Sequence, residues 1–140
     1  MVAALNENKE PLGLIVTGEA ESWLPTLEMI VGPHVLAPYQ VHSKRELLDV
    51  VESGAADAAV LDDGVEWTLD VLQILRMIRR LDRILPVVVV TWRTDRRLLE
   101  DALHLAAFSV VAKPLALEEL LRQIQRMMVR LDELLRKDEP

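Results

Sequence analysis

Short apolar runs rich in β-branched residues alternate with longer amphipathic runs along this chain of 140 residues. The clearest short run, Leu85–Thr91, contains four consecutive valines, which favours a parallel strand buried on both faces. Similar runs predict strands at Leu12–Val16, His34–Val41, Ala58–Asp62 and Ser109–Ala112. Strands that alternate with helices predict an α/β fold, a parallel sheet covered by helices on both faces.

The amphipathic runs predict five helices, and most of them begin near a residue that can act as an N-cap. The expected helices begin at Ser22, at Ser43 with a capping box to Glu46 and an end near Gly54, at Thr68 with an end near Arg83, at Thr94 with an end near Ala106, and at Leu115 with an end at Lys137. Pro38 confines the second strand to a sheet edge or a bulge.

Helical periodicity also sorts the side chains of the predicted 68–83 helix. Val71, Leu75 and Ile78 are expected to face the core. The arginines fall on the opposite, solvent-facing side of that helix, at Arg76, Arg79, Arg80 and Arg83.

Composition excludes several functional classes. A chain of 140 residues with 51% hydrophobic and 28% charged residues can form one hydrophobic core. The absence of cysteine excludes disulfide scaffolds, thiolate metal sites and cysteine nucleophiles. No apolar run is long enough to cross a bilayer, so we expect a cytoplasmic protein without a membrane partner. We expect a flexible segment at 1–11, one domain at 12–127, and an extension of the last helix with a tail at 128–140.

Charge is distributed unevenly along the chain. The net charge is −7, yet acidic residues dominate 1–70 and basic residues outnumber acidic ones in 71–140. Such asymmetry bears on partners rather than on fold. Because the whole chain is acidic and carries no nucleic-acid-reading motif, we do not expect it to bind nucleic acid.

Polar residues follow three predicted strands where each strand ends. Asp62 ends the third strand, Thr91 ends the fourth, and Lys113 follows the fifth. Ligand sites of open α/β sheets form beyond the carboxyl ends of the strands, so these side chains are expected to converge. A carboxylate can accept a phosphoryl group as a nucleophile, while a hydroxyl and an ammonium can hold the phosphoryl oxygens. The three residues therefore form a candidate phosphoryl site.

The sequence resembles the receiver domains of bacterial two-component response regulators. The matching segments are AAVLDDG at Ala58–Gly64, LPVVVVT at Leu85–Thr91 and VVAKPLALEELL at Val110–Leu121. The lysine-proline pair followed by an acidic, leucine-rich helix is the most specific of them. The resemblance implies a flavodoxin-like, doubly wound five-stranded sheet of order 2-1-3-4-5 flanked by five helices.

The resemblance also implies roles for individual residues. Asp62 matches the phosphoacceptor, Thr91 the switch hydroxyl and Lys113 the lysine of the site. A histidine kinase or another signalling protein is then the partner. No enzymatic activity is implied beyond self-phosphorylation and dephosphorylation at Asp62.

The sequence departs from the receiver pattern where that family places its metal-binding acids. Thr17 and Gly18 stand at those positions, so the expected cofactor is none, or Mg²⁺ held weakly at Asp62 with help from Glu19 or Asp63. Trp92 replaces a small residue beside the switch hydroxyl and is expected to crowd the edge or cover the aspartate. Without a phosphoryl group, Lys113 is expected to pair with Asp62.

Three functional hypotheses follow from these residues. The first is a degenerate receiver-like signalling module that acts through protein–protein contacts. The second is an ordinary phosphorylatable receiver, which accepts a phosphoryl group from a histidine kinase on Asp62. The third and least favoured is a flavodoxin-like ligand binder.

The last predicted helix is longer than a receiver needs. Its apolar residues follow two heptad rows, Leu117, Ile124 and Leu131 beside Leu121, Met128 and Leu135. Those beyond Met127 are expected to project past the core and to need a partner. Arg122, Arg126 and Arg130 line the same helix. Because receivers commonly pair through their fourth helix, fifth strand and fifth helix, the resemblance implies a homodimer formed through that face.

Overall fold

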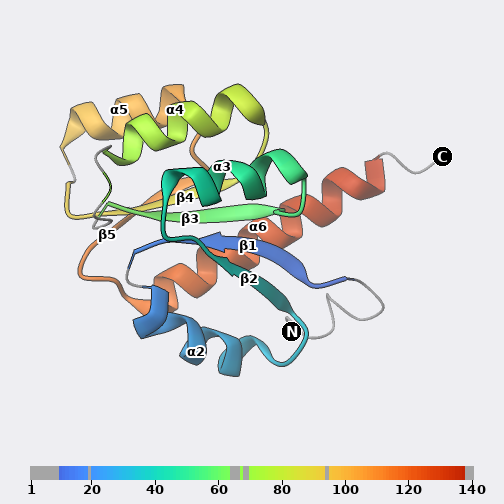
Figure 1. Ribbon diagram of the computed structural model, residues 1–140. Helices are drawn as coiled ribbons and strands as arrows, with labels where there is room; N and C mark the ends of the chain where they lie inside the picture. The colour runs from blue at the N-terminus through green and yellow to red at the C-terminus, as the bar shows by residue number, and fades with distance from the viewer. Residues whose placement is uncertain (1–9, 19, 64–66, 68–69, 94, 138–140) are drawn as a thin grey trace.

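A five-stranded parallel sheet forms the centre of the molecule (Figure 1). The computed structural model describes residues 10–18, 20–63, 67, 70–93 and 95–137. The strands are β1 (Leu12–Val16), β2 (Leu36–Gln40), β3 (Ala58–Asp62), β4 (Val87–Thr91) and β5 (Ser109–Ala112). Their order is β2-β1-β3-β4-β5, which confirms the predicted doubly wound topology.

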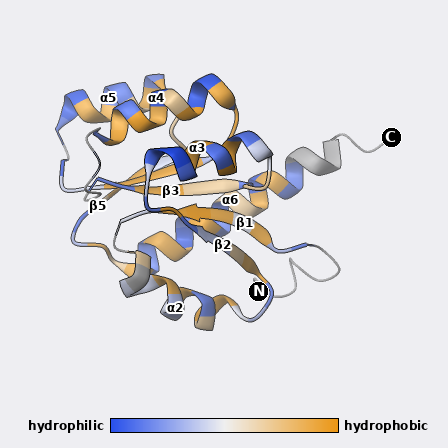
Figure 2. Cartoon of the chain, viewed as in Figure 1, coloured by the Kyte–Doolittle hydropathy of each residue, from blue (hydrophilic) through white to orange (hydrophobic). Residues whose placement is uncertain are grey.

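Five helices in the described part of the chain cover the two faces of the sheet. They are α2 (Ala20–Val31), α3 (Lys44–Ser53), α4 (Val71–Leu81), α5 (Arg96–His104) and α6 (Leu117–Lys137). Figure 1 shows α3, α4 and α5 on one face, and α2 and α6 on the other. The helices turn hydrophobic residues toward the sheet and hydrophilic ones outward (Figure 2). Within the described chain, we find no helix with the length and hydrophobicity that a membrane crossing requires.

The buried strands are those that the sequence pattern marks most clearly. All five residues of β1, β3 and β4 are buried, because helices cover both faces of the central sheet. β2 lies at a sheet edge, as the proline predicts, and Pro38 pairs in register with Leu14. An edge strand leaves one side of its backbone unpaired, so the missing N–H of proline costs no ladder hydrogen bond there.

Ser43 caps α3 as predicted, but only half of the predicted capping box is present, because the Glu46 carboxylate binds the amide of His42 and not that of the cap residue. The Ser43 hydroxyl accepts a hydrogen bond from the Glu46 amide at 3.1 Å, and the Glu46 carboxylate accepts one from the His42 amide at 2.9 Å. Gly54 ends the helix with φ +76°, a conformation that glycine adopts without steric cost.

Three predicted helix starts differ from the structure. Ser22 is not a cap, because α2 begins at Ala20. Asp70 and Asp95 cap α4 and α5, whereas the predicted caps Thr68 and Thr94 lie outside the described residues. The Asp70 carboxylate accepts hydrogen bonds from two backbone amides of the first turn, at 2.7 and 3.1 Å. An aspartate at this position also interacts favourably with the positive end of the helix dipole.

The helical pattern predicts that Arg79 faces solvent, and the structure differs. Its guanidinium donates hydrogen bonds to the carbonyls of Leu105 at 2.7 Å, Ala106 at 3.1 Å and Asp82 at 3.2 Å. Burial lowers the pKa of Arg79, and the charge of Asp82 offsets this only in part. Arg79 thus joins the ends of α4 and α5, where Ala106 adopts φ +57°.

The buried face of α6 differs from the predicted heptad rows. Leu120, Ile124 and Met127 are fully buried, and only Ile124 belongs to those rows. Beyond them, Met128 and Leu131 are partly buried and pack against the core between the sheet and α2. The expectation that the residues after Met127 lack a partner is therefore wrong for these two, and Leu135 has no described side chain.

Candidate functional site

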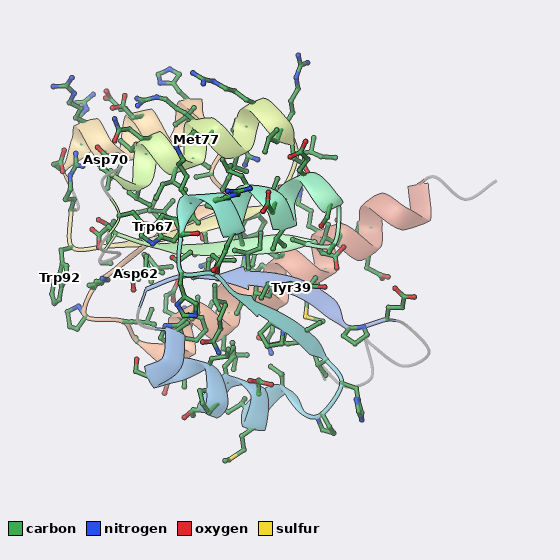
Figure 3. All side chains as sticks on the ribbon, in the orientation of Figure 1. Tyr39, Asp62, Trp67, Asp70, Met77 and Trp92 are labelled. Carbon is green, nitrogen blue, oxygen red and sulfur yellow. The ribbon has the colours of Figure 1, made fainter. Side chains whose placement is uncertain are left out.

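The carboxyl ends of four strands meet at one edge of the sheet, here called the rim. Thr17 follows β1, Asp62 ends β3, Thr91 ends β4 and Lys113 follows β5. The backbone extends the strand pairing into this edge, because the Lys113 amide donates to the Thr91 carbonyl at 2.9 Å. Figure 3 shows Asp62 at this edge with Trp92 beyond it. The parallel topology thus brings together the three residues that the sequence analysis selected.

Lys113 is ion-paired with both carboxylates of the rim. Its ammonium contacts Asp62 Oδ1 directly and lies 3.2 Å from Asp63 Oδ1. The side chains of Lys113 and Asp62 are only 4% and 5% exposed, so this pairing takes place away from bulk water. The predicted Lys113–Asp62 pair is therefore confirmed.

The charge of Lys113 is stabilised in this position. Burial lowers the pKa of Lys113, but the hydrogen bonds and charges of Asp62 and Asp63 outweigh burial and raise it above its ordinary value. The lysine is therefore positively charged at neutral pH. It offsets one of the two negative charges around it.

Asp63 binds Thr91 and the backbone that follows β4. The Thr91 hydroxyl donates a hydrogen bond to Asp63 Oδ2, and the Trp92 amide donates to the same oxygen at 3.0 Å. The Thr91 hydroxyl in turn accepts a hydrogen bond from the Arg93 amide at 2.9 Å. Asp63, expected only to help a weak metal site, contacts the Thr91 hydroxyl instead.

Thr17 and Gly18 pack closely against Asp62. The buried Thr17 hydroxyl accepts a hydrogen bond from the Asp62 amide at 2.9 Å. Gly18 has φ +66°, and a Cβ atom built on it would lie 2.7 Å from Asp62 Cβ and 2.8 Å from Asp62 Cγ. This close approach requires glycine, so position 18 has no room for a carboxylate without movement of Asp62.

Few groups at the rim could bind a metal ion. The described part of the chain contains no group of three or more His, Cys, Asp or Glu side chains arranged to hold one. Glu19, a predicted helper, lies outside the described residues. The carboxylates that do lie here, Asp62 and Asp63, already contact Lys113.

A cavity of about 360 Å³ opens between the rim and α2. Its wall includes Trp23, Thr26, Trp92 and Leu115, and Asp62 and Lys113 contribute from the rim. Trp92 is 65% exposed, and the Lys113 ammonium lies 5.9 Å from its ring centroid, within reach of a cation–π interaction. Trp92 therefore forms one wall of the opening and does not seal it.

Trp67 has a different environment from Trp92. Its indole Nε1 donates a hydrogen bond to the His42 carbonyl at 2.9 Å, and its ring packs against the core cluster beneath α3 and α4. It thus connects the chain after β3 to the chain before α3.

The chain is similar to known response regulators in sequence and structure. A family model described as the response regulator receiver domain matches residues 28–125. Response regulator MprA from Mycolicibacterium vanbaalenii is 36% identical over 86 residues, which are 61% of this chain and 37% of that protein.

Two solved structures share the fold. A CheY-like receiver domain protein from Methanospirillum hungatei JF-1 has a TM-score of 0.74 at 14% identity, over 89% of this chain and 98% of that one. The receiver domain of an HD domain-containing protein from Pseudomonas fluorescens Pf-5 has a TM-score of 0.74 at 15% identity, over 94% and 96%. Since the family model covers well over half of the sequence, this chain belongs to the response regulator receiver domain family.

Proposed function

We propose that this receiver domain signals in a two-component system through protein–protein contacts, without a Mg²⁺-dependent aspartyl phosphate. The pairing of Lys113 with both rim carboxylates is the observation that carries the proposal. The donor set does not fit Mg²⁺, which needs several hard oxygen ligands in octahedral geometry. The positions after β1 supply one hydroxyl, already bonded to the Asp62 amide, and one glycine.

The proposed partner is a histidine kinase or another signalling protein. The chain spans about 37% of the length of Response regulator MprA, so it matches one part of that longer protein. A receiver domain of this kind acts as a binding module rather than as an enzyme. Its surface is then the functional element, and the rim sets the conformation of the segments next to it.

Titration with Mg²⁺ and beryllofluoride, a mimic of the phosphoryl group, tests the proposal. Trp92 lies 5.9 Å from the Lys113 ammonium, so its fluorescence reports on binding at the rim. We expect no saturable change in fluorescence, because Lys113 holds the carboxylate that would coordinate the mimic. Mass spectrometry after incubation with acetyl phosphate and Mg²⁺ is expected to find no added phosphoryl group.

The ordinary phosphorylatable receiver predicts the opposite result. In that case, wild-type fluorescence changes saturably with beryllofluoride, and Asp62→Asn abolishes the change. The same variant then loses a phosphoryl group that mass spectrometry detects on the wild type. The fluorescence result and the mass-spectrometry result, each lost in Asp62→Asn, would each contradict the degenerate site.

We also propose that a second copy of the chain binds the face formed by α5, β5 and α6. Leu103 on α5 is 75% exposed, and Leu99 and Val129 are also exposed. Glu100, three residues before Leu103 on α5, and Arg122 on α6 are both exposed and carry opposite charges. Both signs of charge on one face suit a two-fold interface, which must complement itself.

Sedimentation tests this interface. Wild-type protein is expected to sediment as a dimer, and Leu103→Glu is expected to weaken dimerisation at least tenfold, since it places a charge in an apolar contact. Ile84→Glu, at a similarly exposed position after α4, serves as the matched control. A monomeric wild type, or equal effects of both variants, would argue against this face.

A further inference from the structure

Three hydrogen-bond or ion-pair donors of the rim converge on one carboxylate. Asp63 receives the Thr91 hydroxyl and the Trp92 amide at Oδ2, the latter at 3.0 Å. The Lys113 ammonium lies 3.2 Å from Asp63 Oδ1. A hydroxyl, a backbone amide and an ammonium directed at one point form an oxyanion-binding arrangement. In this chain, the anion that these donors bind is the Asp63 side chain.

The backbone fixes Asp63 in that position. Its amide donates to the Val90 carbonyl at 3.0 Å, one residue beyond the paired part of β3 and β4. The carboxylate is therefore attached to the sheet next to its donors. An anion that is already in place loses no translational freedom when it binds, unlike one from solution.

We propose that Asp63 is a built-in anion that occupies the oxyanion site of the rim and holds the segment Thr91–Arg93 in place without phosphorylation. This inference rests on the proposed function and adds the regulation of the same site. Carboxylate oxygens accept the same donors as phosphoryl oxygens. The donors that a phosphoryl group on Asp62 would need are thus already bound.

The held segment connects the rim to the proposed interface. The Thr91 hydroxyl links the Asp63 carboxylate to the Arg93 amide, two residues before Asp95 caps α5. The exposed Leu99 and Leu103 lie on that helix. Asp63 therefore stabilises the chain that leads into α5, and a rim that lacks this carboxylate has a less ordered connection to the interface.

Nuclear magnetic resonance of Asp63→Ala tests this proposal in the absence of Mg²⁺. The Trp92 amide is expected to shift and to exchange about tenfold to hundredfold faster with water, as for the loss of a hydrogen bond to a charged group. The Arg93 amide is expected to shift, because the Thr91 hydroxyl that accepts its hydrogen bond loses its own acceptor. Asp57→Ala is the matched control, because Asp57 caps the other end of the strand through the Gly13 amide at 2.8 Å. The control is expected to leave the Trp92 and Arg93 signals unchanged.

Addition of acetate provides the second arm. In Asp63→Ala, acetate is expected to return the Trp92 and Arg93 signals saturably toward their wild-type positions, whereas matched chloride does not. Asp63→Asn keeps the side-chain shape and one oxygen acceptor and is expected to give intermediate signals. This variant keeps the test valid if Asp63→Ala does not fold. Unchanged Trp92 and Arg93 signals in Asp63→Ala, or no response to acetate, would overturn the proposal.

These outcomes are independent of the test of the proposed function. Beryllofluoride binding or phosphorylation of Asp62 in the wild type contradicts the metal-independent site, whatever the Trp92 amide does. Unchanged amides in Asp63→Ala contradict the built-in anion, even when the wild type takes no phosphoryl group. The two failures are thus distinguishable.

Discussion

Lys113→Met is expected to lower the free energy of unfolding by about 3–5 kcal/mol at neutral pH, the range for removal of one partner from a buried ion pair. Methionine keeps much of the side-chain volume, so the effect is mainly electrostatic. Without the ammonium, Asp62 and Asp63 remain close together at the rim with no cation between them. Urea unfolding followed by circular dichroism measures the change.

Lys44→Met is the matched control for this variant. Lys44 is exposed on α3, so its loss is expected to change stability by less than about 0.5 kcal/mol. A triple variant that combines Lys113→Met with Asp62→Asn and Asp63→Asn is expected to recover part of the loss, because no uncompensated charge remains. A loss below about 1 kcal/mol in Lys113→Met would mean that the ion pairs contribute little.

The pH dependence of the Lys113 contribution has a definite sign. The pKa of Lys113 is raised in the folded protein, so the folded state binds the proton more tightly than the unfolded state. The contribution is complete below the ordinary pKa of lysine and is lost as the pH rises through the raised value. The stability difference between wild type and Lys113→Met is therefore expected to shrink only in strongly alkaline solution.

The sequence predicts the strands well because burial on both faces leaves a strong local signal. Ala58–Asp62 and Ser109–Ala112 match β3 and β5 residue for residue. The helix starts are less certain from sequence, because two capping residues compete near α4 and near α5. Asp70 and Asp95 act as caps there. Position in three dimensions, rather than local preference, decides between such neighbours.

The candidate site is predictable only in part for a similar reason. Asp62, Thr91 and Lys113 could be placed together because parallel strands share one carboxyl edge. The contacts of Asp63 depend on how the backbone turns after β3, which side-chain alternation does not encode. Arg79 shows the same limit, since its partners are backbone carbonyls after α5. Hydrogen bonds to a distant backbone leave no pattern in the sequence.

Gly18→Ala is expected to lower the free energy of unfolding by about 2–5 kcal/mol, which combines about 1–2 for a left-handed non-glycine residue with about 1–3 for overpacking. The added Cβ would lie 2.7 Å from Asp62 Cβ, closer than two non-bonded carbon atoms can approach. Asp62 is held by Lys113 and by Thr17, so it cannot move aside freely. Thermal and urea unfolding both measure this loss.

Gly54→Ala separates the two contributions to that loss. Gly54 also has a positive φ, +76°, but no atom lies within 4 Å of its added Cβ. Its loss is expected to be about 1–2 kcal/mol, from backbone conformation alone. The excess in Gly18→Ala then measures the contact with Asp62, and equal losses in the two variants would show that Asp62 moves without cost.

The same contact decides whether a metal-binding acid can be restored at this position. Gly18→Asp carries the same Cβ, so it is expected to lose at least as much stability as Gly18→Ala and to show no saturable Mg²⁺ binding by calorimetry. A stable Gly18→Asp that binds Mg²⁺ would contradict this steric argument. If the prediction holds, restoring the acids after β1 is not enough to restore a metal site. Asp62 itself packs into the space that a carboxylate at position 18 would need.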